Sequence, residues 1–217
     1  MSRQHDLGFG AWDLGFGTSN VPPGFEYHPD FLSESEEQAL LGEIVTLPFL
    51  RVEMRGGVAR RRTAHFGWTY GYDSRSTEPG APIPAFLMPL REHVAQWMEV
   101  APDALSEALV TEYPAGAPIG WHRDAPMFDE IAGVSLGAAC RMKFRPYVSP
   151  KDLPARTEGP RRSTHEIELA ARSAYLIRGS ARRDFEHSIP PVIRQRYSVT
   201  FRTMRTRAGR RSQTDRR

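Results

Sequence analysis

The chain has 217 residues, of which 40% are hydrophobic and 25% charged, a composition typical of a globular protein with one hydrophobic core. No apolar run approaches the roughly eighteen residues of a membrane helix, and the N-terminus lacks the basic region and apolar block of a secretory signal. Cys140 is the single cysteine, so an internal disulfide is excluded, and we expect a cytoplasmic monomer that is not attached to a membrane.

The formal net charge of +3 is concentrated at the C-terminal end of the sequence. Residues 203–217 contain six arginines and one aspartate, a net charge of +5, which leaves −2 for residues 1–202. A basic segment of this kind is typical of a protein with a nucleic-acid partner, but it also occurs as a solvated end that aids solubility. The composition leaves both interpretations open.

Composition also divides the chain into three regions. Residues 1–24 contain two copies of DLGFG followed by VPPG. Glycine and proline at this density disfavour a packed element. We therefore expect a flexible arm over 1–24, a folded domain over 25–203 and a disordered basic tail over 204–217.

Two helices are predicted in the first half of the chain, with a β-hairpin between them. Ser33 and Glu36 have the spacing of a capping box, and four apolar residues at helical spacing follow between positions 40 and 45. Residues 50–75 read as a strand, a glycine turn and a second strand. The second helix, over about 84–99, carries its apolar residues on one face and should pack against a sheet.

From Ala108 onward, short strands alternate with glycine and proline. We count eight, at residues 108–113, 119–124, 131–137, 139–146, 164–170, 173–179, 185–190 and 195–203. Eight short strands with turn residues at close intervals predict a double-sheet jelly roll whose mouth can hold a small ligand or a metal. The expected fold is therefore mostly β (α+β), with the two helices packed on one sheet.

The stretch GWHRDAP carries the first chemical signal. His122 and Asp124 stand two positions apart in a strand-like run, so their side chains point to the same face. A third ligand must come from elsewhere, and His187 is the best candidate. Two neutral imidazoles and one carboxylate leave coordination positions open, which suits non-haem Fe(II) and its O₂ chemistry. An isolated His-x-Asp pair is usually without function, so this hypothesis needs support from the rest of the sequence.

The last predicted strand has one apolar face and one cationic face. Tyr197, Val199 and Phe201 alternate with a polar row that contains Arg196 and Arg202. If the strand lies inside the roll, the two arginines are partly buried and need anionic partners. A bound dicarboxylate would satisfy them, because guanidinium groups bind carboxylates through two parallel hydrogen bonds. The alternative is that arginines near the strand ends are merely solvated.

At this point the sequence resembles the AlkB-type Fe(II)- and 2-oxoglutarate-dependent dioxygenases over about residues 60–203. The resemblance is carried by pieces that occur in the family's order: GWT at 67–69, a tyrosine before PAG at 113–116, HRD at 122–124, SLG at 135–137, HSIPP at 187–191 and RYSVTFR at 196–202. The family fold is a double-stranded β-helix of the jelly-roll type, in agreement with the strand count. The resemblance thus implies an enzyme that uses Fe(II), 2-oxoglutarate and O₂.

The resemblance also implies roles for particular residues. The implied iron ligands are His122, Asp124 and His187. Arg196 would pair with the distal carboxylate of 2-oxoglutarate, helped by Tyr113, and Arg202 would lie nearer the carboxylate and keto group that chelate the metal. The family often has asparagine at the positions of Thr111 and Ser198, which are small and can still hydrogen-bond to the cosubstrate.

Substrate contacts are implied on the predicted hairpin. Trp68 matches a position that lies over the substrate base in AlkB proteins, and Tyr72 is expected to share that role, although a core-packing role for Trp68 is equally consistent with the sequence. Arg60, Arg61 and Arg62 lie just upstream, and basic residues beside an aromatic platform suit the phosphate backbone of DNA or RNA.

The implied function is oxidative demethylation of N-alkylated bases in DNA or RNA, with release of formaldehyde, succinate and CO₂. Some AlkB proteins carry a base-reading carboxylate two residues beyond the metal aspartate, and here that position is Pro126. The same chemistry on a protein or transfer-RNA substrate is therefore an alternative. Two further classes are a Zn(II) hydrolase, which needs no cationic inner strand, and a metal-containing nucleic-acid binding module without catalysis.

Overall fold

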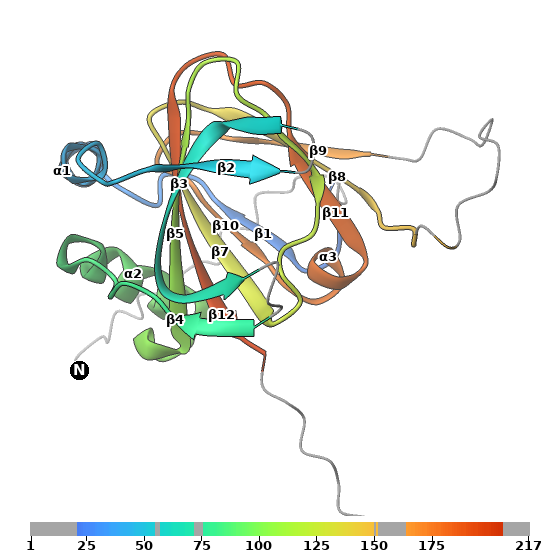
Figure 1. Cartoon of the computed structure of the whole chain (residues 1–217), viewed down its shortest axis with the longest axis horizontal. Coiled ribbons are helices and arrows are strands. Elements are labelled where there is room, and N and C mark those ends of the chain that lie inside the picture. The colour runs from blue at the N-terminus through green and yellow to red at the C-terminus, as the bar shows by residue number, and fades with distance from the viewer. Residues whose placement is uncertain (1–20, 55–56, 72–75, 150, 152–163, 206–217) are drawn as a thin grey trace, which may run out of the picture.

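The computed structural model describes residues 21–54, 57–71, 76–149, 151 and 164–205, which form two antiparallel sheets facing each other and two long helices on one outer side (Figure 1). The larger sheet has the order β1-β10-β7-β12-β5-β3-β2, with β4 paired to β3, and the smaller sheet has the order β6-β11-β8-β9. This is the predicted double-sheet architecture. No helix in the described ranges is long and apolar enough to cross a bilayer.

The strands of the larger sheet come from the whole length of the chain. They are β1 (Phe25–His28), β2 (Leu50–Met54), β3 (Gly57–Gly71), β4 (Ser76–Pro79), β5 (Leu105–Tyr113), β7 (Phe128–Leu136), β10 (Ala174–Ile177) and β12 (Arg196–Met204). The smaller sheet contains β6 (Ile119–His122), β8 (Cys140–Pro146), β9 (His165–Leu169) and β11 (Phe185–Ile189). Each of the eight strands predicted after Ala108 and both strands of the predicted hairpin are present, whereas β1 and β4 were not predicted.

The helices α1 (Glu34–Ile44) and α2 (Met88–Met98) cover the outer face of the larger sheet, as predicted (Figure 1). The capping box at the start of α1 is confirmed: the Ser33 hydroxyl accepts a hydrogen bond from the Glu36 amide, and the Glu36 carboxylate accepts one from the Ser33 amide. Short 3₁₀ turns, η1 (Ala85–Leu87) and η2 (Pro102–Ala104), flank α2. The five-residue α3 (Gly179–Arg183), before β11, was not predicted.

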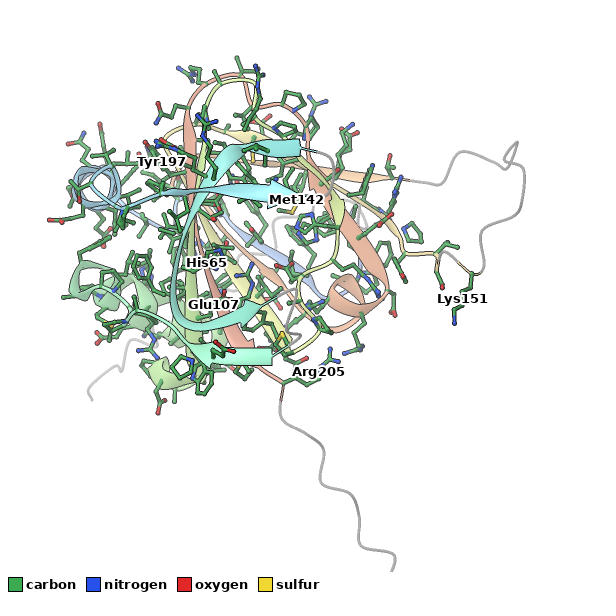
Figure 2. All side chains as sticks on the ribbon, viewed as in Figure 1. His65, Glu107, Met142, Lys151, Tyr197 and Arg205 are labelled. Atoms are coloured by element: carbon green, nitrogen blue, oxygen red, sulfur yellow. The ribbon has the colours of Figure 1, made fainter. Side chains whose placement is uncertain are left out.

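Strand β12 separates two hydrophobic clusters, because its side chains alternate between the two faces of the larger sheet. Tyr197, Val199 and Phe201 pack in the cluster beneath α1 and α2, as predicted, and Figure 2 shows Tyr197 on this side. The second cluster fills the space between the sheets and contains Met142 and Phe144 of β8. The polar row of β12 faces this inner space, where the candidate site lies.

The regions predicted at the two ends stay predictions. Residues 1–20 of the arm and 206–217 of the tail lie outside the described residues. Residues 21–24 are described, and there the carbonyl of Pro23 accepts a hydrogen bond from the amide of Ala181 in α3.

Candidate metal centre

Three side chains that are far apart in the sequence meet between the sheets. His122 of β6 is directly opposite His187 of β11 in the antiparallel pairing, and their ring centroids are 4.3 Å apart. Asp124 follows two residues after His122, and its Oδ2 lies 3.6 Å from His187 Nε2. One ligand atom from each residue lies within 4.8 Å of the others. The structure therefore brings the predicted triad together in a group that can hold one metal ion.

The hydrogen bonds and surroundings of the imidazoles favour metal binding. His122 Nδ1 lies 2.9 Å from the carbonyl oxygen of Gly120. Because a carbonyl can only accept, Nδ1 carries the proton and Nε2 keeps its lone pair for a metal. Burial, and secondarily the neighbouring His122, lower the pKa of His187 to about 3, although Asp124 acts in the opposite direction. His187 is therefore neutral near pH 7, as a metal ligand must be.

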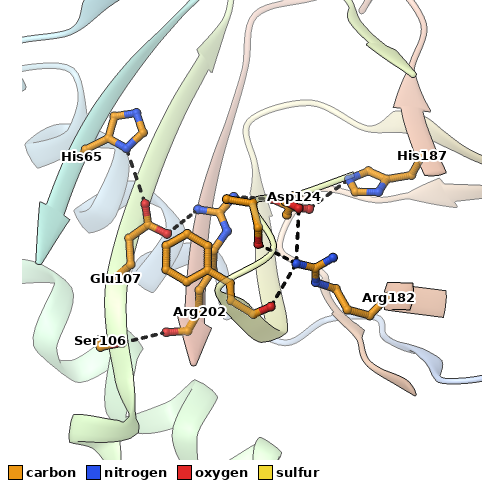
Figure 3. A network of polar contacts seen from close by, with 9 residues as sticks. His65, Ser106, Glu107, Asp124, Arg182, His187 and Arg202 are labelled. Carbon is orange, nitrogen blue, oxygen red and sulfur yellow. Dashed lines mark hydrogen bonds and ion pairs between the residues drawn. The ribbon is translucent and has the colours of Figure 1, made fainter. Parts of the chain in front are cut away.

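Asp124 is held as an anion by a buried network that Figure 3 shows. Burial would raise its pKa, but Arg202 and then the two histidines bring the pKa well below the ordinary range. Arg202 Nη2 donates to Asp124 Oδ1 at 2.7 Å, and Arg202 Nη1 donates to Glu107 Oε2 at 2.8 Å. The other oxygen of Glu107 lies 3.5 Å from Nδ1 of His65. This arrangement occupies Oδ1 and leaves Oδ2 of Asp124 facing the histidines.

Arg182 of α3 fixes the loop that carries Asp124. Its Nη2 donates to the carbonyl oxygens of Ala125 at 2.8 Å, Phe128 at 3.0 Å and Asp124 at 3.3 Å. Three backbone acceptors on one guanidinium nitrogen restrict the conformation of this turn between β6 and β7. Because a displacement of the turn would move Asp124, we assign Arg182 a structural role at the metal centre.

Arg196 stands at the other end of β12 and is fully buried. Its Nε donates to the Ser135 hydroxyl at 3.0 Å, and its guanidinium carbon lies 5.0 Å from the centre of the Tyr113 ring. Its Nη1 and Nη2 have no hydrogen-bond partner among the described residues. A buried guanidinium with two unpaired nitrogens is costly unless an anion binds there, and a carboxylate matches its geometry.

The remaining predicted cosubstrate residues line the same inner face. Ser198 is paired with Thr111 across β12 and β5, just as Arg196 is paired with Tyr113, and both small residues are buried. Strand pairing therefore places all four on one continuous surface. Their contacts with 2-oxoglutarate stay a prediction.

Tyr175 of β10 is a neighbour that sequence reasoning missed. It is paired with Gly133 of β7, and its ring occupies the space above that glycine, where a Cβ would lie only 2.3 Å from the ring. Burial is the main cause of its raised pKa. Arg196 lowers that pKa, whereas Tyr113 and Asp124 raise it further, so all three lie within electrostatic range of its hydroxyl. Tyr175 thus contributes to the surface between Arg196 and the metal centre.

The three predicted substrate arginines do not form one patch. In the pairing of β3 with β5, Arg62 stands opposite Glu112, and its Nε donates to the Glu112 carboxylate. The guanidinium of Arg62 lies 5.6 Å from the Phe49 ring, on the helix side of the sheet. Arg60 donates to the Gly116 carbonyl. Arg61 is adjacent to Arg62 on the strand, so its side chain points to the opposite, inner side of the sheet, where its charge lowers the pKa of Tyr113. Arg61 is thus the arginine of the three whose charge acts on a residue of the predicted site.

Trp68 lies in β3 and is exposed, with 41% of its surface accessible. It follows Gly67, whose φ of +78° favours glycine and where a Cβ would lie 2.2 Å from the Ser106 carbonyl oxygen. The exposure of Trp68 disfavours a core-packing role and agrees with a surface available for contact. Tyr72 lies outside the described residues.

Comparison with known proteins defines the class. The sequence model of the family described as "2OG-Fe(II) oxygenase superfamily" matches residues 24–214, nearly the whole chain. The chain therefore belongs to the 2OG-Fe(II) oxygenase superfamily, and the AlkB-type resemblance found in the sequence is confirmed. The described domain is accordingly that of a 2OG-Fe(II) oxygenase.

The relatives carry AlkB names. The chain is 30% identical over 183 residues to the "Alkylated DNA repair protein ALKBH8 homolog" of Arabidopsis thaliana, and the match covers 77% of this chain and 51% of the relative. It is 26% identical over 184 residues to the mouse "tRNA (carboxymethyluridine(34)-5-O)-methyltransferase ALKBH8", covering 81% and 25% of the two chains. The "Probable RNA/DNA demethylase ALKBH6" of Danio rerio is 27% identical over 143 residues, with coverage of 65% and 58%.

A solved structure supports the fold. The structure of OsALKBH1 superposes with a TM-score of 0.61 at 14% identity, covering 84% of this chain and 98% of that one. At this identity the likeness shows the jelly-roll fold alone. The chain spans about a quarter to somewhat more than half of the length of the curated relatives named above.

Proposed function

We propose that the protein uses Fe(II), 2-oxoglutarate and O₂ to oxidise an alkyl group on a nucleic-acid base. The first candidate reaction is demethylation of N-alkylated bases in DNA or RNA, with release of formaldehyde, succinate and CO₂. One observation carries the proposal: the triad of metal ligands faces the same space between the two sheets as Arg196, a fully buried guanidinium with two nitrogens that have no partner among the described residues. A Zn(II) hydrolase would have no use for such a group.

The donor set fits Fe(II). Two neutral imidazoles, from His122 and His187, and one ionised carboxylate, from Asp124, form the 2-His-1-carboxylate set of non-haem iron oxygenases. When bound, iron with 2-oxoglutarate and O₂ supplies the oxidising power. The chain supplies orientation: Arg202 holds Asp124 Oδ1, Gly120 fixes the tautomer of His122, and the rings around His187 limit the access of water.

The inner face fits 2-oxoglutarate. Arg196 would bind its distal carboxylate through Nη1 and Nη2, beside Tyr113, Ser198 and Thr111. Both Nη atoms of Arg202 are occupied by carboxylates of the protein, but its Nε has no partner among the described residues. The predicted contact of Arg202 with the cosubstrate would therefore use Nε.

The nucleic-acid part of the proposal rests on an aromatic and a cationic group of β3. Trp68 presents an exposed ring on β3, and Arg61 lies on the inner side of the same strand. Such a combination suits a base removed from its stack and the phosphates beside it. Two relatives are named for alkylated-DNA repair or RNA/DNA demethylation, which supports the same substrate class.

A transfer-RNA substrate is the second candidate. Pro126 is exposed and stands where a base-reading carboxylate could have been, which weakens recognition of a methylated adenine or cytosine. The mouse relative is named as a methyltransferase of a tRNA carboxymethyluridine, although this chain spans only 25% of its length. Pro126 therefore leaves the base open, and the name of the mouse relative is what supports a modified uridine in tRNA as the second candidate.

Mass spectrometry of defined nucleic acids tests the proposal. The protein is incubated with Fe(II), 2-oxoglutarate and a panel of methylated DNA and RNA oligonucleotides, together with bulk tRNA. The expected result is a mass loss of one methyl group or a gain of one oxygen on one substrate class, absent in the His187→Ala variant. Succinate formation without any change in a base across the whole panel would refute a nucleic-acid substrate and would favour a protein substrate.

A further inference from the structure

A pocket that we call the arginine pocket opens beside the metal centre. It is lined by Arg123, Asp124, Ala125, Pro126, Arg182, Arg183 and Arg205 and has a volume of about 420 Å³. Asp124 belongs to both sites, so whatever binds in this pocket lies next to the metal ligands. The proposed function assigns none of these arginines a contact with the substrate.

Three separate segments build the arginine pocket. Arg123 lies on the loop after β6, Arg182 and Arg183 belong to α3, and Arg205 follows the end of β12, where Figure 2 places it and where its amide donates to the Met127 carbonyl at 2.7 Å. Arg182 is held by three backbone carbonyls of the metal-site loop. The pocket is therefore anchored to the same loop that positions Asp124.

Arg123 is also fixed in place. Its Nη1 donates to the carbonyl oxygen of Arg183 at 3.3 Å, and its guanidinium carbon lies 3.4 Å from the centre of the Tyr147 ring. A guanidinium held by stacking and by a backbone bond has lost much of its rotamer freedom before any ligand binds. Its remaining N–H groups are available to an acceptor.

The described residues do not balance the charge of the arginine pocket, which contains four arginines and one carboxylate. Its single carboxylate, Asp124, already accepts a hydrogen bond from Arg202. Within the described part of the chain, Arg123, Arg183 and Arg205 form no ion pair, and the nearby Asp184 accepts from the Ser180 hydroxyl instead. Burial lowers the pKa of Arg182, Asp124 acts in the opposite direction, and the positive charges of Arg205, Arg202 and Arg123 lower the pKa further, so these cations are close together. Cations gathered in a concave site attract an anion.

We propose that the arginine pocket binds a backbone phosphate of the nucleic-acid strand, next to the base that enters the metal centre. The guanidinium fork matches the geometry of phosphate oxygens, and a base drawn into the site keeps its phosphates within reach of groups around the mouth. The proposal rests on the nucleic-acid substrate of the proposed function and adds the position of one phosphate. This contact also fixes the strand relative to the metal, because Arg182 links pocket and metal loop.

Oligonucleotides in which one phosphate is replaced by an uncharged linkage test this pocket directly. Binding of single-stranded oligonucleotides with one alkylated base is measured by fluorescence anisotropy, with the full chain loaded with Mn(II) and 2-oxoglutarate. Each oligonucleotide carries one uncharged methylphosphonate in place of a phosphate, moved stepwise along the strand. The variant is Arg183→Gln with Arg205→Gln, since both side chains are exposed and Arg182 is left to hold the loop. Arg141→Gln is the matched control, because Arg141 is an exposed cation on the outer face of β8.

The wild type should lose about tenfold in affinity when one linkage beside the alkylated base is neutral. The double variant should bind the all-phosphate strand about tenfold more weakly, with a salt dependence reduced by about 0.7 per lost contact, and should be indifferent to that same linkage. The Arg141→Gln control should behave as the wild type.

Base oxidation by the iron-loaded protein, measured in parallel, separates the two claims. A wild type that oxidises the base but binds every methylphosphonate strand equally well would refute the arginine pocket alone. A double variant that keeps its sensitivity to the linkage would do the same. A wild type that neither binds nor oxidises any oligonucleotide would refute the proposed function and the arginine pocket together.

Discussion

Arg202 Nη2 donates to Asp124 Oδ1 at 2.7 Å across 78 residues of sequence, and through this bond the last strand of the fold orients a metal ligand. The same guanidinium binds Glu107, so it joins two buried carboxylates. Lysine at this position would reach only one of them, because an ammonium lacks the fork of the guanidinium. We predict that Arg202→Lys lowers the affinity for Mn(II) by about 10-fold to 100-fold, as measured by calorimetry.

The matched control for this variant is Arg178→Lys, which changes an arginine that pairs with Glu26 on the surface. It should leave the Mn(II) affinity unchanged. Equal affinities in the wild type and Arg202→Lys would show that Arg202 does not orient Asp124.

Arg196 gives a prediction in which stability and binding move in opposite directions. Arg196→Met removes a buried guanidinium with two unpaired nitrogens and replaces it with an apolar chain of similar length. The variant without cosubstrate should be at least as stable as the wild type. Thermal unfolding with Mn(II) should show that 2-oxoglutarate raises the Tm of the wild type and not that of Arg196→Met. A Tm increase of the same size in both proteins would contradict the assignment of Arg196.

Gly133 tests the role of Tyr175. A Cβ at this position would lie 2.3 Å from the tyrosine ring, so Gly133→Ala must displace the ring, at a cost of about 1–3 kcal/mol in the free energy of unfolding. Because Tyr175 lies near both Arg196 and Asp124, the affinity for 2-oxoglutarate should fall as well. Urea unfolding and cosubstrate titration measure the two effects. In the Tyr175→Ala background, Gly133→Ala should cause no further loss of stability, because the ring that it would displace is gone. A loss as large as in the wild type would exclude this steric mechanism.

The lowered pKa of His187 predicts how the stability of the metal-free protein depends on pH. Burial lowers its pKa to about 3, whereas an unfolded chain binds a proton there at about pH 6.5. Between these values the unfolded state binds the extra proton, so the free energy of unfolding falls as the pH falls, by up to about 1.4 kcal/mol per unit. Asp124, whose pKa is also lowered, contributes in the same direction, but its stabilisation is present above the ordinary pKa of an aspartate and is lost only as the pH falls below that value.

Urea unfolding in EDTA between pH 6.5 and 5 therefore isolates His187. The slope of stability against pH should be shallower by about one proton in His187→Asn than in the wild type. His28→Asn, which changes an exposed histidine, serves as the control. A slope in His187→Asn identical to that of the wild type would show that His187 is not buried in the neutral form.

Local patterns predicted much of this fold. The capping box at Ser33 and the alternation along β12 depend on residues close in sequence, and both are present in the structure. The triad was found because a strand-like run placed His122 and Asp124 together and His187 was the best third candidate, although β6 ends at His122 and Asp124 lies on the loop that follows. The four-residue strands β1 and β4 were not predicted, because four residues are too few to show a period; β6 and β10 are equally short and were predicted only within the series of strands punctuated by glycine and proline.

The partners that complete the site depend on pairing between distant strands. Glu107 meets Arg202 because β5 lies beside β12, and Tyr175 covers Gly133 because β10 lies beside β7. No local signal in the sequence fixes those registers. For Arg60 to Arg62, in contrast, a local signal was present and was not used: alternation along a strand indicates that neighbouring side chains face opposite sides of the sheet.

The central claim is that His122, Asp124 and His187 hold Fe(II) while Arg196 holds 2-oxoglutarate beside it. Anaerobic titration of the full chain with Fe(II) and 2-oxoglutarate tests it most directly, because this pair forms a visible charge-transfer band that zinc cannot produce. The band should appear in the wild type, should be absent in His187→Ala, and should require far more 2-oxoglutarate in Arg196→Met. A wild type without the band, or variants that form it at wild-type concentrations, would contradict the account.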